Sequence, residues 1–180
     1  AVDDARQDYF VFESFWRSDQ HDPERSHFDI RELYWERTWE RLELRLGIRK
    51  VFWGVAEAQH LVDIINQTDY VENPDGEEKL GQPMLNLALV QGWGTLDLFL
   101  LPGFRERTFP GRSGRLRFPL PVDSDASEYE SGSEAAHLDW ALRWYRSIGG
   151  WDVGISHFAG TSREPRLDVR WQRFRPLLVP

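Results

Sequence analysis

The sequence predicts an all-β protein: an antiparallel up-and-down sheet of about seven strands that forms part of a transmembrane β-barrel. Three observations lead to this fold class. Apolar and polar residues alternate with a period of two along much of the chain, short and long connections alternate between these segments, and aromatic residues lie near both ends of them. Such alternation indicates strands with one apolar and one polar face, and short turns opposite long loops are typical of outer-membrane barrels.

Composition excludes several other classes of protein. With 41% hydrophobic and 29% charged residues, the chain is too apolar to be disordered. It has no cysteine, which excludes disulfides, thiolate metal sites and a cysteine nucleophile. The net charge of -8 argues against a general nucleic-acid binder, whose binding surface would be basic. The apolar run 98–101 stops at Pro102, so no segment has the length of a membrane helix.

The first three expected strands are Tyr9–Arg17, His27–Glu36 and Leu42–Phe52. Along the second, apolar residues suggest one face, although Glu32 and Glu36 interrupt it. The third alternates clearly until its last residues. Its apolar positions are Leu42, Leu44, Leu46 and Ile48, and its polar or small ones are Glu43, Arg45, Gly47 and Arg49.

Four further strands are expected at Met84–Gln91, Gly94–Leu101, His137–Arg146 and Trp151–Gly160, and they form two hairpins. A two-residue turn at Gly92–Trp93 pairs residues 87–90 with 95–98 so that like faces meet. A turn at Ile148–Gly149 does the same for residues 142–145 and 152–155. The order of connections around these strands is short, long, short, long and short.

The strands run about eight to eleven residues, near the length that a tilted membrane strand needs. Aromatic residues suggest two girdles, with Trp39, Trp93 and Trp151 at the short-turn end and Trp53, Phe104 and Phe109 at the long-loop end. The alternative is that these residues fill a soluble core. An eighth strand could begin near Leu177, but the tail 166–180 and the first strand lack expected partners. Residues 1–180 are therefore expected to be a single domain, the N-terminal segment of a larger barrel whose sheet is still open.

Three stretches carry a family resemblance. They are 44–54, which reads LRLGIRKVFWG and is followed by Glu57 and Asn66–Asp69, together with 100–107 and 157–165. They resemble proteobacterial porin-like outer-membrane barrel proteins of a largely uncharacterised family, although Ile48-Arg49 stands where such proteins often have Arg-Gln. The resemblance implies a bacterial outer-membrane location and a role in transport, and it brings no known catalytic or ligand residue.

If the apolar faces meet lipid, a set of charged residues points into the barrel and lines its pore. These pore-lining candidates are Glu43, Arg45, Arg49, Asp97, Asp139, Arg143 and Asp152. Charge of both signs on a water-filled passage would set its selectivity. The alternatives are a solvated face of a soluble sheet, or charges that only pair with one another.

The long segment 53–83 is expected to contain a short helix through Ala58–Ile65 and either to fold into the barrel mouth or to cap it from outside. Its loop candidates are Glu57, His60, Asp63 and Asp69. His60 and Asp63 would share a helical face, but two ligands without a third predict no metal site. Both long loops are acidic, which suits oxygen ligation of a divalent cation, although solvated charge is the simpler interpretation.

An enzyme is not expected. Ser156, His137 and Asp139 could lie on one face, but Ser156 would pair closest to Ala141, away from His137. The sequence also has no nucleophile elbow, no phosphate-binding glycine loop and no zinc motif.

The predicted function is therefore porin-like passage, passive or partner-coupled, of small solutes or lipid-like cargo across the outer membrane, without a cofactor. The expected partners are outer-membrane lipid, the cargo itself and, in a coupled system, an inner-membrane transporter, but no nucleic acid. The alternative is a soluble periplasmic or secreted β-sandwich that binds a ligand such as carbohydrate. In that case the leucine faces would pack against a second sheet.

Overall fold

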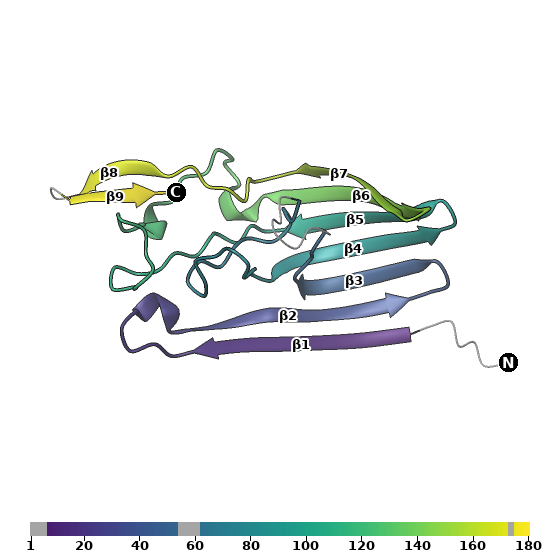
Figure 1. Cartoon of the computed structure of the whole chain (residues 1–180), viewed down its shortest axis with the longest axis horizontal. Helices are drawn as coiled ribbons and strands as arrows, with labels where there is room; N and C mark the ends of the chain where they lie inside the picture. The colour runs from purple at the N-terminus through teal and green to yellow at the C-terminus, as the bar shows by residue number, and fades with distance from the viewer. Residues whose placement is uncertain (1–6, 54–61, 173–174) are drawn as a thin grey trace.

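The structure is a computed structural model that describes the chain apart from residues 1–6, 54–61 and 173–174 (Figure 1). Its main feature is a seven-stranded antiparallel sheet in which the strands pair in chain order. The strands are β1 (Gln7–Arg17), β2 (His27–Thr38), β3 (Leu42–Arg49), β4 (Gln82–Gln91), β5 (Gly94–Pro102), β6 (Leu138–Ile148) and β7 (Trp151–Ala159). The predicted all-β class is confirmed, and each expected strand is present within a few residues of its predicted ends. Among the described strands, β1 and β7 are the two edges of this sheet.

Short and long connections alternate as predicted. The links 39–41, 92–93 and 149–150 lie at one end of the sheet, and the links 50–81 and 103–137 lie at the other (Figure 1). The connection from β1 to β2 also lies at the long-loop end and contains a 3-10 turn at Pro23–Arg25. Two more such turns, Ser124–Ala126 and Glu134–Ala136, lie in the link before β6.

The β4–β5 hairpin has the predicted turn and register. Gly92 and Trp93 connect the strands, Leu89 lies opposite Leu96, and position 88 lies opposite position 97. Because side chains alternate between faces, a slip of one residue would have moved every leucine of one strand to the polar face. The apolar pattern therefore determines this register.

The β6–β7 hairpin corrects the predicted turn. Its turn residues are Gly149 and Gly150 instead of Ile148 and Gly149, and Trp144 lies opposite Ile155 instead of Val153. The two glycines have φ values of 54° and 88°, which glycine adopts without a steric penalty and which a two-residue hairpin turn favours. The register moves by two residues, so every side chain keeps its predicted face.

The C-terminal tail also differs from the prediction that it lacks a partner. Two further strands, β8 (Asp168–Gln172) and β9 (Arg175–Val179), pair antiparallel as a separate hairpin. Its second strand is tied to the loop before β6, since Asp123 N donates to Leu178 O at 2.8 Å and Leu178 N donates to Pro121 O at 2.9 Å. The expected eighth strand thus belongs to a small second sheet at the long-loop end.

The two faces of the main sheet have opposite burial from those of a water-soluble sheet. One face, here called the leucine face, carries the alternating leucines and most of the strand aromatics, and none of its described residues is buried. On this face Phe12 is 60% exposed, Ile155 69% and Trp151 77%. The opposite face, here called the inner face, contains buried polar and small residues. They include Gln82, Asn86, Ala88, Asp97, Asp139 and Ala141.

The long loops fold back over the inner face and form the core with it. Trp53 and Ile65 from the link between β3 and β4 pack with Met84, Phe99, Leu101 and Ala141. All four of these strand residues lie on the inner face. The apolar core therefore lies between the inner face and the loops, and the leucine face takes no part in it.

This arrangement corrects one of the two predicted aromatic girdles. At the long-loop end, Trp53 is 5% exposed and Phe109 is 7% exposed, because both are buried beneath the loops. The outward aromatics at that end are instead Trp16 and Phe28 on neighbouring strands. At the short-turn end Trp93 and Trp151 are exposed, as a girdle requires.

The glycine turn can be tested by substitution. Gly150→Ala should lower the free energy of unfolding by about 1–2 kcal/mol, because a Cβ is strained at positive φ. Gly92→Ala is the matched control, since that glycine has open space around its Cβ position and no positive φ. Urea titration of both variants measures the difference. Equal stability of the two variants would contradict the assigned turn.

Candidate functional site

The seven pore-lining candidates all belong to the inner face. Glu43, Asp97 and Arg143 lie in one row across the sheet, with Ala88 between the first two. Arg45 lies in the next row, opposite Asn86. The remaining candidates are Arg49 opposite Gln82, Asp139 opposite Leu101 and Asp152 opposite Ser147. The period-two pattern was sufficient to place all of them on one face.

Arg45 is held by carboxylates on both sides. Its Nε and Nη2 donate to the two carboxylate oxygens of Glu36 at 2.8 and 3.3 Å, and Nη2 also donates to Glu43 at 2.5 Å. Its Nη1 donates to Asn86 Oδ1 at 3.2 Å. A two-pronged contact of this kind holds the guanidinium in one orientation. For Arg45 and Glu43, the contacts therefore match the alternative interpretation, in which the charges pair with one another.

Arg49 and Arg143 differ from Arg45, because no described carboxylate lies within ion-pair distance of either one. Arg49 Nη1 donates to Asn86 Oδ1 at 3.2 Å, and its guanidinium lies 4.8 Å from the ring centre of Tyr34. Arg143 Nη2 donates to the backbone oxygen of Trp53 at 3.0 Å. Both cations are therefore oriented by neutral groups.

Asp139 is the most enclosed of the seven candidates, with no exposed surface. Arg163, from the segment after β7, donates to its Oδ2 at 2.6 Å and to Ile65 O at 3.0 Å. The backbone N–H of Thr161 donates to Oδ1 at 3.1 Å, and His137 Nδ1 lies 2.6 Å from the same oxygen. Asp139 thus joins two loops to β6. Asp152, by contrast, is exposed at the short-turn end and accepts a hydrogen bond from Ser147 Oγ at 2.6 Å.

The catalytic arrangement that the sequence did not favour involved Ser156, which lies opposite Arg143 and not opposite Ala141. His137 contacts Asp139 within an arrangement that Arg163 neutralises. No contact in the structure joins Ser156 to that pair among the described residues.

Of the loop candidates, Glu57 and His60 lie outside the described residues. Asp63 accepts a hydrogen bond from the backbone N–H of Trp53, and Asp69 is fully buried. The expected helix through Ala58–Ile65 also lies largely outside the described residues, and 62–65 are not helical. Asn66 fastens this loop, since its Nδ2 donates to Arg49 O at 2.7 Å and to Leu80 O at 2.8 Å.

Asp69 meets Arg31, a residue that the sequence pattern did not single out. The β1–β2 register shifts between Glu13 and Ser14, which face Glu32 and Ile30, so Arg31 has no partner across the pair. Such a bulge re-aims a side chain. Arg31 is 3% exposed, and its Nη2 lies 2.8 Å from Asp69 Oδ2.

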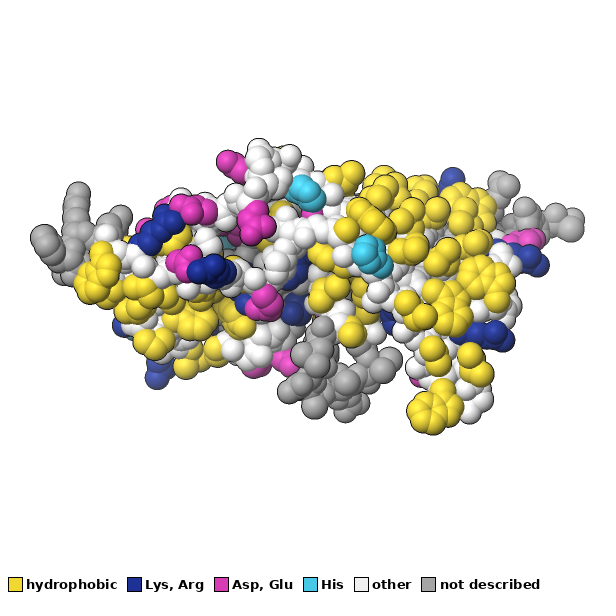
Figure 2. Space-filling view, turned by 90° about the horizontal axis from the view of Figure 1, so that it is seen from above, with side chains coloured by type: hydrophobic (Ala, Val, Ile, Leu, Met, Phe, Trp, Pro, Cys, Tyr) yellow, Lys and Arg dark blue, Asp and Glu magenta, His cyan; other side chains and the backbone are white. Residues whose placement is uncertain are grey.

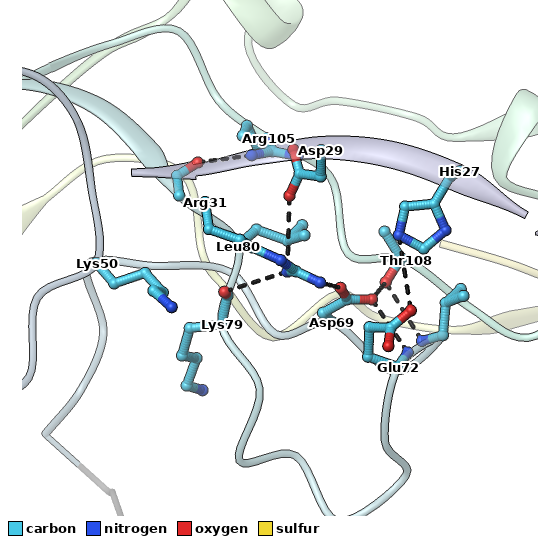
Figure 3. A network of polar contacts seen from close by, with 12 residues as sticks. His27, Asp29, Arg31, Lys50, Asp69, Glu72, Lys79, Leu80, Arg105 and Thr108 are labelled. Carbon is cyan, nitrogen blue, oxygen red and sulfur yellow. Dashed lines mark hydrogen bonds and ion pairs between the residues drawn. The ribbon is translucent and has the colours of Figure 1, made fainter. Parts of the chain in front are cut away.

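A polar network surrounds this ion pair (Figure 3). Thr108 Oγ1 donates to Asp69 Oδ1 at 2.6 Å, and Arg105 lies 2.9 Å from Asp29, which in turn is 3.6 Å from Arg31. Two long loops are thereby connected to β2. The sequence pattern could not predict this contact, because Arg105 and Asp29 are far apart along the chain and meet only in the folded protein.

His27, Asp69 and Glu72 present ligand atoms within 4.8 Å of one another, the spacing of a metal site. However, Arg31 already pairs with Asp69 at 2.8 Å, and Arg17 pairs with Glu72 at 2.7 Å. Two guanidinium groups at the same carboxylates disfavour a bound cation. The arrangement fits internal ion pairing of the acidic loop.

An open cleft of about 820 Å³ lies at the long-loop end, between the loop before β6, the exit of β7 and the β8–β9 hairpin. Arg107 forms part of its floor and is 8% exposed. It donates to the Glu164 carboxylate at 2.9 and 2.7 Å and to Arg163 O at 2.6 Å. Tyr129 in the cleft wall has a raised pKa, because of burial and of its hydrogen bond to Glu106.

Comparisons of the chain with protein-family models, with curated proteins and with solved structures found no match. Within the described residues, no helix has the length and apolar character needed to cross a membrane.

The buried pair of Asp139 and Arg163 should be important for stability. Arg163→Met should lower the free energy of unfolding by about 3 kcal/mol, because it leaves a carboxylate buried without its cation. Arg166→Met, which removes an exposed ion pair with Asp168 at 3.2 Å, should cost at most about 0.5 kcal/mol. Chemical unfolding of both variants gives the comparison. Similar losses would mean that the buried pair has no special weight.

The contact between Arg107 and Glu164 should weaken in acid. The hydrogen bonds from Arg107 lower the pKa of Glu164, although burial acts in the opposite direction. A lowered folded-state pKa gives stabilisation that is complete above the ordinary carboxyl value of about 4.3 and is lost as the pH falls through the folded-state value. Amide exchange in segment 161–165 should therefore accelerate in acid beyond its intrinsic pH trend. Glu164→Gln should remove this dependence, and an unchanged profile would contradict the assignment.

Proposed function

We propose that the chain forms part of the wall of a porin-like β-barrel in the bacterial outer membrane, with the leucine face toward lipid and the inner face along a polar passage. The proposal rests on one observation, which is that the apolar face is exposed while polar residues of the other face are buried. In a water-soluble sheet the apolar face is covered and the charged face is solvated. Here Ile155 is 69% exposed, whereas Asp97 is 8% exposed and Asp139 is fully buried.

The exposed apolar surface is extensive and lies along the strands. Figure 2 shows hydrophobic side chains gathered over the strand half of the molecule, seen from the side of β7, and most acidic side chains of that view over the loop half. Large contiguous apolar patches are rare on soluble monomers. A second sheet would have to cover the leucine face of a soluble sandwich, but the described residues of that face are all at least partly exposed. This observation favours the barrel over the sandwich.

Strand length supports the same proposal. The eleven residues of β6 extend about 34 Å along the strand at about 3.4 Å per residue. With a tilt of about 40°, they would rise about 26 Å along the membrane normal, close to the roughly 25 Å apolar band of outer-membrane barrels. The ion pair between Asp8 and Arg37 on the leucine face lies at the short-turn end, where the proposed barrel would meet water.

Closure would require more strands than the main sheet contains. The edges of β1 and β7 present unpaired backbone groups, which cannot remain unsatisfied in lipid. In the proposed barrel these edges pair with further strands. The resemblance of segments 44–54, 100–107 and 157–165 to porin-like proteins agrees with this proposal. The proposed passage carries small solutes or lipid-like cargo, passively or coupled to an inner-membrane transporter, without enzymatic chemistry.

Two neighbouring residues on β7 provide the test. Ile155 belongs to the leucine face and Ser156 to the inner face, and both are exposed. In detergent or lipid, Ile155→Arg should lower the free energy of unfolding by about 2–4 kcal/mol, the cost of a cation at the lipid face. Ser156→Arg, the matched control, should cost under about 1 kcal/mol, because its side chain borders water.

Planar-bilayer conductance of the unmodified protein completes this test. We expect stepwise conductance together with dependence of the folded state on detergent or lipid. If the protein stays folded and monodisperse without detergent, conducts no ions and tolerates Ile155→Arg, the barrel proposal is wrong. In water a side chain that is already exposed loses nothing on this substitution.

A further inference from the structure

The charges on the inner face are not equally compensated. The described carboxylates in the middle of this face have donors close by: Glu36 and Glu43 accept from Arg45, and Asp97 interacts with the Asn86 amide. Arg49 and Arg143 have no carboxylate within ion-pair distance among the described residues. These two guanidinium groups therefore differ from Arg45, which pairs directly with two carboxylates.

Arg49 also has an unused donor. Its Nη1 contacts Asn86 and its guanidinium lies over Tyr34, but Nε is buried without a hydrogen-bond partner. An unsatisfied buried donor destabilises a folded protein, and native structures contain few of them. The Nε–H of Arg49 thus has no acceptor among the described residues, and a bound group could provide one.

Trp53 presents a second unused donor in the same region. This residue is 5% exposed, and its indole Nε1 is buried without a partner. Its ring lies 5.4 Å from the ring of Phe99, which lies directly opposite Asn86, the residue that Arg49 contacts. Trp53 and the side chain of Arg49 therefore contact two residues, Phe99 and Asn86, that lie opposite each other on β5 and β4.

Arg143 adds the second cation to this group. Its guanidinium lies 5.5 Å from the ring centre of Trp53 and 4.8 Å from that of Tyr145, and it donates to Trp53 O at 3.0 Å. Aromatic faces and a carbonyl orient the guanidinium without neutralising it. Arg49, Trp53 and Arg143 thus present only donors. Donors alone match an acceptor-rich anion, and the planar guanidinium fork suits carboxylate and phosphate oxygens in particular.

We propose that Arg49, Arg143 and Trp53 Nε1 form an oxyanion-binding site on the inner face, which takes a phosphate or carboxylate group. If the proposed passage is correct, on which this second part rests, the cargo is anionic. The anionic group could belong to a small free solute or to the headgroup of a lipid-like molecule. The two sources share the same chemistry and differ in the apolar part that accompanies it.

Binding of inorganic phosphate tests the site directly. The full chain in detergent micelles is titrated by equilibrium dialysis at constant ionic strength, and we expect saturable binding of one phosphate per chain. Arg49→Gln and Arg143→Gln should each weaken binding at least about tenfold, the loss expected for a charge-assisted hydrogen bond. Trp53→Phe keeps the aromatic ring but removes the N–H, and it should weaken binding about threefold or more.

The control is Arg37→Gln, which removes a guanidinium from the leucine face, where it pairs with Asp8 at 2.8 Å. It should leave phosphate binding unchanged. Arg49→Lys and Arg143→Lys keep the charge and the fold while losing the fork, so they should give intermediate affinities. Absence of saturable binding to the unmodified protein, or equal loss in Arg37→Gln, overturns the site.

Two further measurements separate the ligand source and the passage. Tighter binding of dihexanoyl phosphatidate than of inorganic phosphate would assign the site to a lipid headgroup, and equal or weaker binding would assign it to a free anion. In a planar bilayer under a KCl gradient, the reversal potential should indicate anion preference that Arg49→Gln reduces. Phosphate binding without conductance would uphold the site and contradict the pore. Conductance without anion preference or phosphate binding would uphold the pore and overturn this inference.

Discussion

Alternation of side chains between the two faces of a strand is the constraint on which the rest of this structure depends. Because side chains alternate along each strand, the sheet has one face rich in leucine and aromatic side chains and another that holds most of the charged, amide and small side chains together with the core residues Met84, Phe99 and Leu101. The loops could have covered either face. They cover the polar one, so the polar groups of that face need partners inside the protein instead of water.

Arginines join several segments of the chain in the covered region. Arg31, Arg45, Arg107 and Arg163 each contact groups from at least two segments of the chain, and three of them are at most 8% exposed. A guanidinium suits this task because its several donors lie in one plane and can satisfy a carboxylate and a carbonyl together. The loops are therefore held to the inner face by directional contacts and by a small apolar core around Phe99 and Leu101. This combination explains how a face lined with charge can still be closely covered.

In the proposed barrel, the same distribution of contacts would determine which charges on the inner face a solute meets. Where an arginine pairs with a carboxylate, as at Arg45 or at Asp139, the ion pair holds parts of the fold together. Arg49 and Arg143 are instead oriented by aromatic rings and neutral oxygens, without a direct carboxylate partner among the described residues. A passage along this face would thus be selective at a few positions, not along its whole length.

Local patterning was sufficient for the strands, for the assignment of each strand residue to a face and for the β4–β5 register, because all of these depend on a two-residue period that is visible along the chain. The glycine pair at 149–150 is also a local turn signal, and a turn placed one residue earlier displaces the β6–β7 register by two residues without changing any face. Only part of the candidate site could be predicted from the sequence. Its strand residues follow from alternation, but Trp53 was expected outside and is buried inside, and neither Arg31 nor Arg163 was singled out. These residues act through contacts such as that from Arg163 to Ile65, which joins segments 98 positions apart. No local period encodes such a contact, because it exists only once the loops have folded over the polar face.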